Sequence, residues 1–343
     1  MSVVTIACDE SGSEGENLMG SHHQVFVHAS TCVSLDLAES LMADLRRATR
    51  SQAVEVKSKV ALAQHNRSAL IEFLNAIGDA GNIHLVDKAY FVVAKMVDVT
   101  LSPDGVAGLA GLARQWADLL HTLGPGAVGS QRWNNLLTTF NRLIRSYLRQ
   151  GSTPPQPRVF FDSLEEARAA CEDPTVEALL SAIWDARRRV LKLATAGPLE
   201  LREIDPMGPA LTAVAMTWCM RLGNVPMEFV ADNYSGLNDV LRDAIITAAR
   251  LPLEIAGHSL PRPDIRSIRL VDSRSDARVQ VADVLGGVGR ELADLASAGT
   301  FDDALQIAAK DLLDYNAMCS TGSPIDRLID IHTPSYAIGL AGS

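Results

Sequence analysis

The order of apolar segments constrains the fold of this chain more than any other feature of its sequence. Residues 3–8 and 24–31 alternate between apolar and polar side chains, which predicts two antiparallel strands joined across a glycine-bearing loop. Further along, two segments of strand character are each followed by a segment of helical periodicity. These pairs are 227–231 with 236–250 and 265–271 with 279–296. The order predicts an α/β fold in which helices flank a mixed sheet.

The rest of the chain is predominantly of helical periodicity. Ser34 is suited to cap a helix that runs toward Arg50, because apolar residues follow it at helical spacing. Further helices are predicted at 61–80, at 164–194 with a break at Pro174, at 209–222, and after Phe301 before an irregular tail. Further strands are predicted at 83–97, broken near Asp87, and at 158–162.

Composition narrows the class of protein. With 343 residues, 47% of them hydrophobic, the chain can bury the core of one elaborated domain. It contains no apolar run of membrane-spanning length and no signal-peptide pattern, and its five cysteines form no motif typical of disulfides or zinc sites. These features predict a cytoplasmic protein without a membrane partner. Because the net charge is −10, a nucleic acid would have to contact a local basic surface.

Acidic residues stand where predicted strands end. Asp9 and Asp232 each follow an apolar strand, and the carboxyl ends of neighbouring parallel strands meet at one edge of a sheet, where ligands bind. On the last long predicted helix, Gln280 and Asp283 share one face, and glycines on the next turn allow close packing against the sheet. Asp162 ends another predicted strand and is the alternative to Asp232 as the central acid, the acid that lies beside Asp9. Each motif taken alone can also be a solvated turn or cap.

Residues 103–151 are predicted to be a helical insertion or cap within a single domain of residues 1–343. Their helical periodicity is interrupted at 124–126 by Gly-Pro-Gly and ends at a proline-rich segment, 151–157. The apolar residues of this stretch need a surface to cover. We expect the insertion to lie over or beside the acidic site and to contribute no acid to it.

Motifs at both ends of the chain resemble those of a known family. Asp-Glu-Ser-Gly at 9–12 closes the first strand, and Asp-Ser at 272–273 is followed by Gln-x-Ala-Asp at 280–283. Between them, Glu55-Val56-Lys57 matches an intermediate Glu-x-Lys. The chain thereby resembles the domain of unknown function 3800 family. This resemblance implies a ribonuclease H-like fold and a metal-dependent nuclease site.

Ligand chemistry predicts a mechanism for these residues. Carboxylate oxygens suit Mg²⁺ or Mn²⁺, and two such ions can activate water and stabilise the leaving oxygen of a phosphodiester in RNA or DNA. We predict that Asp9 bridges the ions, with Asp232 and Asp283 on either side. Glu55 is a further ligand or orients water, and Lys57 neutralises charge on a phosphate oxygen in the transition state.

Several alternatives stay open at this point. Gln280 can hold a metal ligand or a metal-bound water, or it can cap a loop. Glu55 and Lys57 can equally form a surface ion pair. The protein as a whole can be a non-catalytic interaction module, in which the insertion serves a partner or a second copy in a homodimer. It can also be a phosphatase that acts on a small phosphorylated substrate.

Overall fold

A five-stranded sheet forms the centre of the protein, in the strand order β3-β2-β1-β4-β7. The computed structural model describes residues 3–12, 18–20, 23–53, 55–102, 112–145, 156–194, 206–233, 237–251, 254–255, 258–259 and 262–330. The strands of the sheet are β1 (Val4–Ser11), β2 (Val25–Thr31), β3 (Gly81–Asp87), β4 (Met227–Asp232) and β7 (Ile265–Val271). β2 is antiparallel to β1 and β3, whereas β4 is parallel to β1 and β7. The predicted mixed sheet is therefore confirmed, and β1, β4 and β7 end at the same edge. A separate short pair consists of β5 (Glu254–Ile255) and β6 (His258–Ser259).

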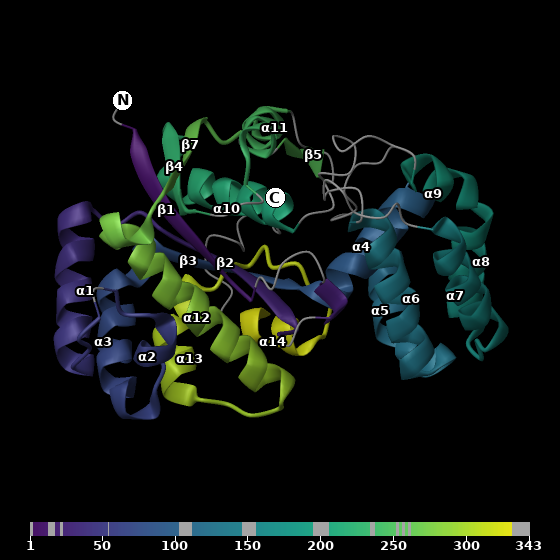
Figure 1. Ribbon diagram of the computed structural model, residues 1–343, viewed down its shortest axis with the longest axis horizontal. Helices are drawn as coiled ribbons and strands as arrows, with labels where there is room; N and C mark the ends of the chain where they lie inside the picture. Colours follow the sequence, from purple (N-terminus) through teal and green to yellow (C-terminus); the bar gives the residue numbers. More distant parts are fainter. Residues whose placement is uncertain are drawn as a thin grey trace.

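Helices cover both faces of the sheet (Figure 1). One face carries α1 (Leu35–Thr49), α2 (Ser58–Ala61), α3 (Arg67–Ile77), α12 (Ala277–Ser297), α13 (Asp303–Ala309) and α14 (Pro324–Asp330). The opposite face carries α10 (Met207–Leu222) and α11 (Asp239–Ala249). Side chains alternate between the two faces of a strand, so Val27 of β2 joins the core under α12 while Phe26 joins the core under α10. Within the described residues, no helix is long and apolar enough to cross a membrane.

Short 3₁₀ helices complete the secondary structure. They are Leu18–Gly20, Gln64–Asn66, Gly78–Ala80, Ser273–Ser275 and Lys310–Leu312.

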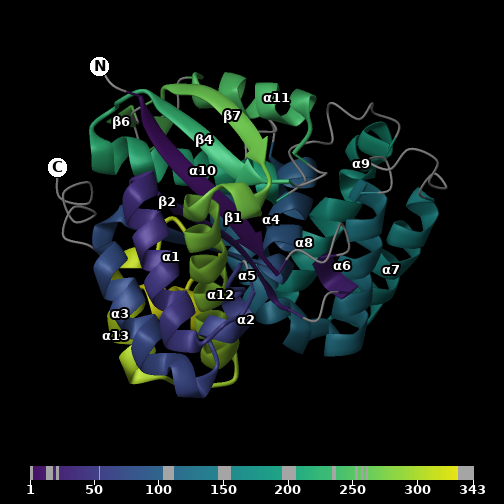
Figure 2. The ribbon, with the colours of Figure 1, turned by 60° about the vertical axis from the view of Figure 1, so that its left-hand side comes forward.

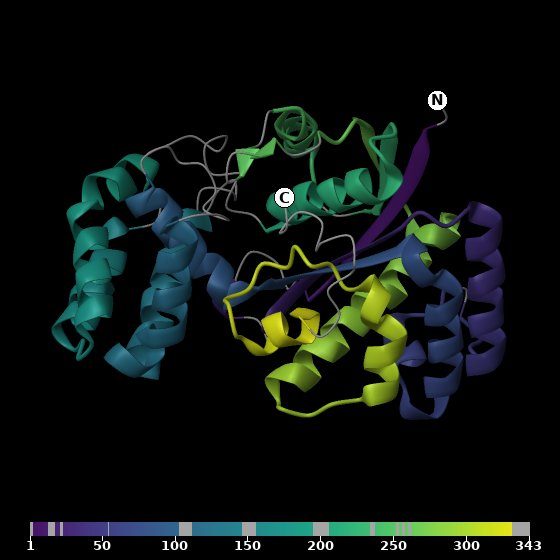
Figure 3. The ribbon, with the colours of Figure 1, turned by 180° about the vertical axis from the view of Figure 1, so that it is seen from behind.

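A helical bundle stands beside the sheet, as the view from behind in Figure 3 shows. It consists of α4 (Lys88–Leu101), α5 (Leu112–Val128), α6 (Ser130–Arg145), α7 (Pro157–Ala169), α8 (Pro174–Asp185) and α9 (Arg187–Ala194). Its apolar core is continuous with the core under α10, because Phe140 and Leu180 belong to the same buried cluster as Ile6 and Trp218. α5 and α6 lie within the expected insertion, 103–151, and the bundle extends beyond it on both sides.

Two segments that were predicted as strands are helices. β3 ends at Asp87, whose side chain caps α4 by accepting a hydrogen bond from the Tyr90 amide at 3.0 Å. α4 is buried on nearly all sides, so residues 88–97 form an apolar run that resembles a buried strand. The predicted strand 158–162 lies in α7. That helix begins at a proline, which suits a first helical turn.

The predicted interruption of the insertion at 124–126 is also misplaced. α5 continues through Pro125 to Val128, and the chain turns at Gly129, whose φ is 84°. Gly124 lies against Trp133 of α6, where an added Cβ would come within 2.5 Å of a ring atom. This close contact lets α5 and α6 pack as the predicted helical hairpin.

Candidate functional site

β1 and β4 run side by side in the sheet (Figure 2). Asp9 and Asp232 lie next to each other near the carboxyl ends of these strands. The parallel register pairs Cys8 with Ala231, so the two acids follow at once on strands about 4.8 Å apart. Residues two positions earlier on each strand pack against α12, which places both acids on the face that α12 covers. The strand-end position predicted for both residues is therefore what the structure contains.

α12 brings Asp283 to the same edge of the sheet. The helix lies close to its neighbours at glycines: a Cβ on Gly286 would be 3.3 Å from Cβ of Ser11, and one on Gly287 would be 2.3 Å from Cβ of Ser58. The Asp283 carboxylate accepts hydrogen bonds from the Ser58 amide at 3.3 Å and from the Ser58 hydroxyl at 3.4 Å. Close packing of α12 against β1 and α2 thus positions this acid.

Glu55 and Lys57 form an ion pair beside Asp283. The Lys57 Nζ lies 2.8 Å from Glu55 Oε1, and the Glu55 side chain is only 13% exposed. Partial burial disfavours the charged lysine, but the hydrogen bond to Glu55 and the charges of Asp283 and Asp9 outweigh it and hold the pKa of Lys57 above its usual value. The ion pair is therefore part of the acidic cluster and not a remote surface pair.

Burial and neighbouring carboxylates disfavour the ionised forms of Asp9 and Asp283. Burial, together with the charges of Glu10, Asp283 and Asp232, raises the pKa of Asp9 to about 8, against an opposing hydrogen bond from the Glu10 amide. Burial also raises the pKa of Asp283, although Lys57 and the Ser58 hydrogen bonds act in the opposite direction. Negative charge at Asp9 therefore needs a positive group to balance it.

Gln280 supports the site indirectly. Its Nε2 donates to the Ser273 carbonyl oxygen at 2.9 Å, and the Ser273 amide in turn donates to Asp232 Oδ1 at 3.1 Å. The same oxygen of Asp232 also accepts from the Asn233 amide at 2.8 Å. Of the two roles left open by the sequence, the structure contains the loop-capping one. Among the described residues, the buried Oε1 of Gln280 has no hydrogen-bond partner.

Two other acids of the motifs are occupied elsewhere. Asp162 lies on α7 with an exposed side chain, where its carboxylate is 3.6 Å from Arg158, so it does not end a strand beside Asp9. Asp272 is partly exposed, and its hydrogen bonds with Arg274 lower its pKa to about 2. Asp232 is therefore the acid that stands next to Asp9.

Sequence reasoning missed residues that shape the turn after Asp9. Gly12 has φ of 77°, and a Cβ there would come within 2.4 Å of the Val25 carbonyl oxygen, so the turn requires glycine. Arg290 of α12 donates to the Ser11 hydroxyl at 3.0 Å. Its spacing from Asp283, seven residues or two helical turns, is a signal that could have placed it on the same helix face.

The carboxylates surround Asp9 without being assembled for a metal ion. Within the described part of the chain, no group of three His, Cys, Asp or Glu side chains stands in an arrangement that could hold one. Asp283 is turned toward Ser58, and Asp232 is held by two backbone amides. Binding of a cation therefore requires side chains to rotate toward Asp9.

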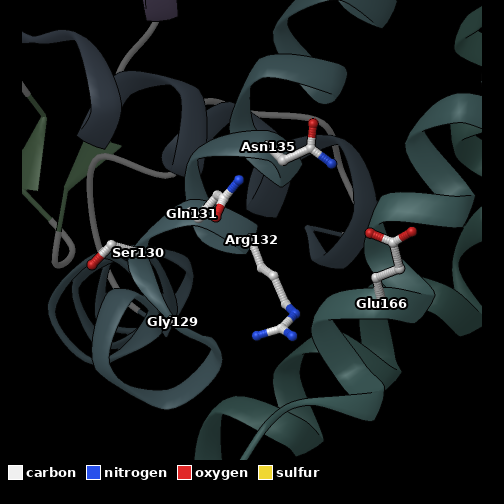
Figure 4. Close-up of a pocket in the computed structure, with 6 residues that line it drawn as sticks. All are labelled: Gly129, Ser130, Gln131, Arg132, Asn135 and Glu166. Atoms are coloured by element: carbon white, nitrogen blue, oxygen red, sulfur yellow. The ribbon is translucent and has the colours of Figure 1, made fainter.

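A cavity of about 630 Å³ lies elsewhere, in the helical bundle. Figure 4 shows its lining, in which Arg132 at the start of α6 faces the same space as Glu166 of α7. The complete lining is Gly129, Ser130, Gln131, Arg132, Asn135 and Glu166. None of the acids of the strand-end cluster lines it, so the cavity and the candidate site are separate features.

Comparisons of the chain with protein-family models, with curated proteins and with solved structures gave no match. The family resemblance therefore rests on the short sequence motifs alone.

Proposed function

We propose that this protein is a nuclease that depends on Mg²⁺ or Mn²⁺, with a ribonuclease H-like fold of the domain of unknown function 3800 type. The observation that carries the proposal is the placement of the acids: Asp9 and Asp232 lie next to each other where parallel strands end, and α12 brings Asp283 to the same edge of the sheet. The raised pKa of Asp9 supports it. A divalent cation is the group that would balance several carboxylates gathered in one place.

The order of elements around the acids supports the proposed fold. A ribonuclease H-like arrangement has a strand, a helix, a second strand and an acid-bearing helix in succession from the central acid. Among the described residues, β4, α11, β7 and α12 follow this order, with the short pair β5 and β6 and the 3₁₀ turn Ser273–Ser275 between them. β4 and β7 also extend the sheet from β1 in parallel.

The residues present fit such an ion by chemistry. Asp9, Asp232 and Asp283 would hold it, because they offer the oxygen ligands that Mg²⁺ and Mn²⁺ prefer. The Asp283 hydrogen bonds to Ser58 are long, at 3.3 and 3.4 Å, so this carboxylate can turn toward Asp9 at low cost. When bound, the ion supplies an activated water and stabilisation of the leaving oxygen.

The chain itself supplies the remaining functions. Glu55 fixes Lys57 so that its ammonium group lies within the electrostatic influence of Asp9 and Asp283, where it can neutralise charge that develops on a phosphate oxygen. Gln280 holds the turn whose amide keeps Asp232 oriented. A direct ligand role for Gln280 is not part of the proposal.

A specific observation favours the alternative of a non-catalytic interaction module. Asp283 and Asp232 both make hydrogen bonds that tie α12 to α2 and β4 to the turn after β7. In that role the acids hold the fold together and bind no ion. The two functions differ in whether the protein binds a divalent cation.

Replacing Asp9 by Asn tests the proposal. Asn keeps the shape of Asp but removes the charge that holds a divalent ion. We expect the wild type to bind Mn²⁺ in calorimetry and to cleave RNA or DNA only with Mg²⁺ or Mn²⁺. Asp9→Asn should lower the cleavage rate by about a hundredfold or more, as expected when metal catalysis is lost.

Asp162→Asn is the matched control, since it makes the same chemical change on an exposed acid of α7. It should leave Mn²⁺ affinity and cleavage at the wild-type level. If the wild type binds no Mn²⁺ and cleaves neither RNA nor DNA, the nuclease proposal is wrong and the interaction module takes its place. Hydrolysis of small phosphomonoesters alone would replace the nuclease by the phosphatase.

A further inference from the structure

Among the described residues, Arg290 forms no ion pair with a carboxylate. It is half-buried on α12, and among the described residues its guanidinium makes one hydrogen bond, to the Ser11 hydroxyl at 3.0 Å. Other arginines close to the site are paired: Arg274 with Asp272 and Arg278 with Asp276. A partly desolvated guanidinium with free donors is suited to bind an anion.

Ser11 and Arg290 face each other across the contact of β1 with α12. They lie next to Asp9 and Asp283, further along the same contact. Ser11 lies two residues after Asp9, on the same face of β1 and about 7 Å along it. Arg290 lies seven residues after Asp283, on the same side of α12 and about 10 Å along it. Ser11 with Arg290 and Asp9 with Asp283 are thus neighbouring positions along the same contact of β1 with α12. The two positions lie too far apart for one phosphate to contact both.

The turn that carries Ser11 is firmly held. Lys88, which is buried, donates to the carbonyl oxygens of Gly12 at 2.7 Å and of His23 at 2.8 Å. The tight contact of Gly286 with Ser11 fixes the turn from the side of α12. The donors of Arg290 are therefore presented from a preorganised framework, which lowers the entropic cost of binding.

We infer that Arg290, together with the Ser11 hydroxyl, binds a backbone phosphate of a nucleic-acid strand next to the phosphodiester that is cleaved at the acids. This subsite rests on the proposed function. It identifies the substrate as a polymer, because a second phosphate contact beside the reacting one has no counterpart in a substrate with a single phosphate. Arg290 binds as a fork of N–H donors, and Ser11 adds an O–H donor.

Binding of short oligonucleotides to variants tests the subsite. The probes are fluorescent single-stranded RNA and DNA oligonucleotides, and affinity is measured by anisotropy with Ca²⁺ in place of Mg²⁺, since its looser coordination supports binding better than turnover. Arg290→Gln should weaken binding about tenfold, as for loss of a charged hydrogen bond. It should also reduce the slope of log affinity against log salt by about 0.7, which corresponds to one phosphate contact on a single strand.

Arg266→Gln is the matched control, because Arg266 stands at the start of β7, at the opposite edge of the sheet, and is paired with Asp264. It makes the same change in net charge and should change affinity less than twofold. Arg290→Lys should recover most of the affinity and keep the wild-type salt slope. Ser11→Ala should keep that slope as well, whereas a purely structural Arg290 that only holds Ser11 would give Ser11→Ala and Arg290→Gln the same loss.

The results separate the subsite from the nuclease proposal. Metal-dependent cleavage with equal affinity of the wild type and Arg290→Gln would overturn the subsite and leave the nuclease. Arg290-dependent binding without cleavage in any metal would keep the subsite and overturn the nuclease. If neither oligonucleotide binds, the subsite proposal is overturned. An effect of Arg290→Gln that is confined to turnover of p-nitrophenyl phosphate would also overturn it, because the residue would then contact a small substrate.

Discussion

The raised pKa of Asp9 links the protonation of the site to the stability of the folded protein. Its pKa is about 8 in the folded protein, against the usual 3.8, so the folded protein keeps a proton that the unfolded chain releases. The contribution of Asp9 to stability is therefore fully present at low pH and is lost as pH rises from about 4 to about 8. If the proposed divalent cation binds, it would replace the proton and restore this contribution.

Asp9→Asn should therefore stabilise the metal-free protein at pH 8 and have little effect at pH 4. Asn cannot ionise, so the variant avoids a cost on the order of 5 kcal/mol, equivalent to a rise in melting temperature of roughly 5–10 °C for a chain of this length. The measurement is thermal unfolding in EDTA across this pH range. With Mn²⁺ at pH 8 the difference in melting temperature between Asp9→Asn and the wild type should narrow or reverse, because only the wild type is stabilised by the ion. Unfolding curves of the two proteins that run parallel from pH 4 to pH 8 would contradict the raised pKa.

At the scale of residues, sequence reasoning placed the acids but not their partners. Asp9, Asp232 and Asp283 are found from local rules, since a strand end and a helix face are both read from neighbouring residues. Ser58 and Arg290 were missed because their contacts depend on how closely α12 approaches α2 and β1, which sequence spacing does not define. The role of Gln280 stayed open for the same reason.

α12 is the element on which the site depends. It contacts β1, β2 and α2 along its length, and Gly287 lies where a side chain would meet Ser58 of α2. Gly287→Val should push α2 away from α12 and break the hydrogen bonds that hold Asp283. Because α2 is a single short turn that can shift, the loss of stability should be modest, about 1–3 kcal/mol. Mn²⁺ affinity should stay the same or rise, because Asp283 can then turn toward Asp9 without first breaking its bonds to Ser58.

Gly126→Val provides the control for this change, since a Cβ at Gly126 of α5 meets nothing within 4 Å. It introduces the same side chain into a helix of the bundle. Calorimetric titration with Mn²⁺ and chemical unfolding of both variants measure the two effects. A clear fall of Mn²⁺ affinity in a folded Gly287→Val protein would mean that Asp283 needs its Ser58 hydrogen bonds to bind the ion.

At the scale of elements, the sequence predicted the sheet better than the bundle. The strands of the sheet are found as short apolar runs, and the helices α1 and α11 each bury one face, so their periodicity identifies them. α4 is buried on nearly all sides and has no such periodicity, and residues 158–162 are too few to separate a strand from a helical turn. Both errors arise where burial or segment length removes the pattern that distinguishes the two structures.

At the scale of the whole molecule, the bundle and the sheet share a core. Buried residues of α6 and α8 belong to the same apolar cluster as β1 and α10, and Lys88 joins the start of α4 to the turn after β1. We therefore expect the protein to unfold in one cooperative transition. Leu136→Ala in α6 and Leu285→Ala in α12 should each lower the free energy of unfolding by about 2–5 kcal/mol, as for other buried leucines.

Both variants should shift the same calorimetric transition, because Leu285 packs on one face of the sheet whose other face shares a core with the bundle. Differential scanning calorimetry of the wild type and both variants measures this directly. Independent bodies would give two transitions, of which Leu136→Ala moves one and Leu285→Ala the other. A single transition that moves with both changes would mean that the bundle cannot open away from the acids as a separate unit. The substrate would then have to reach Asp9 with the bundle in place.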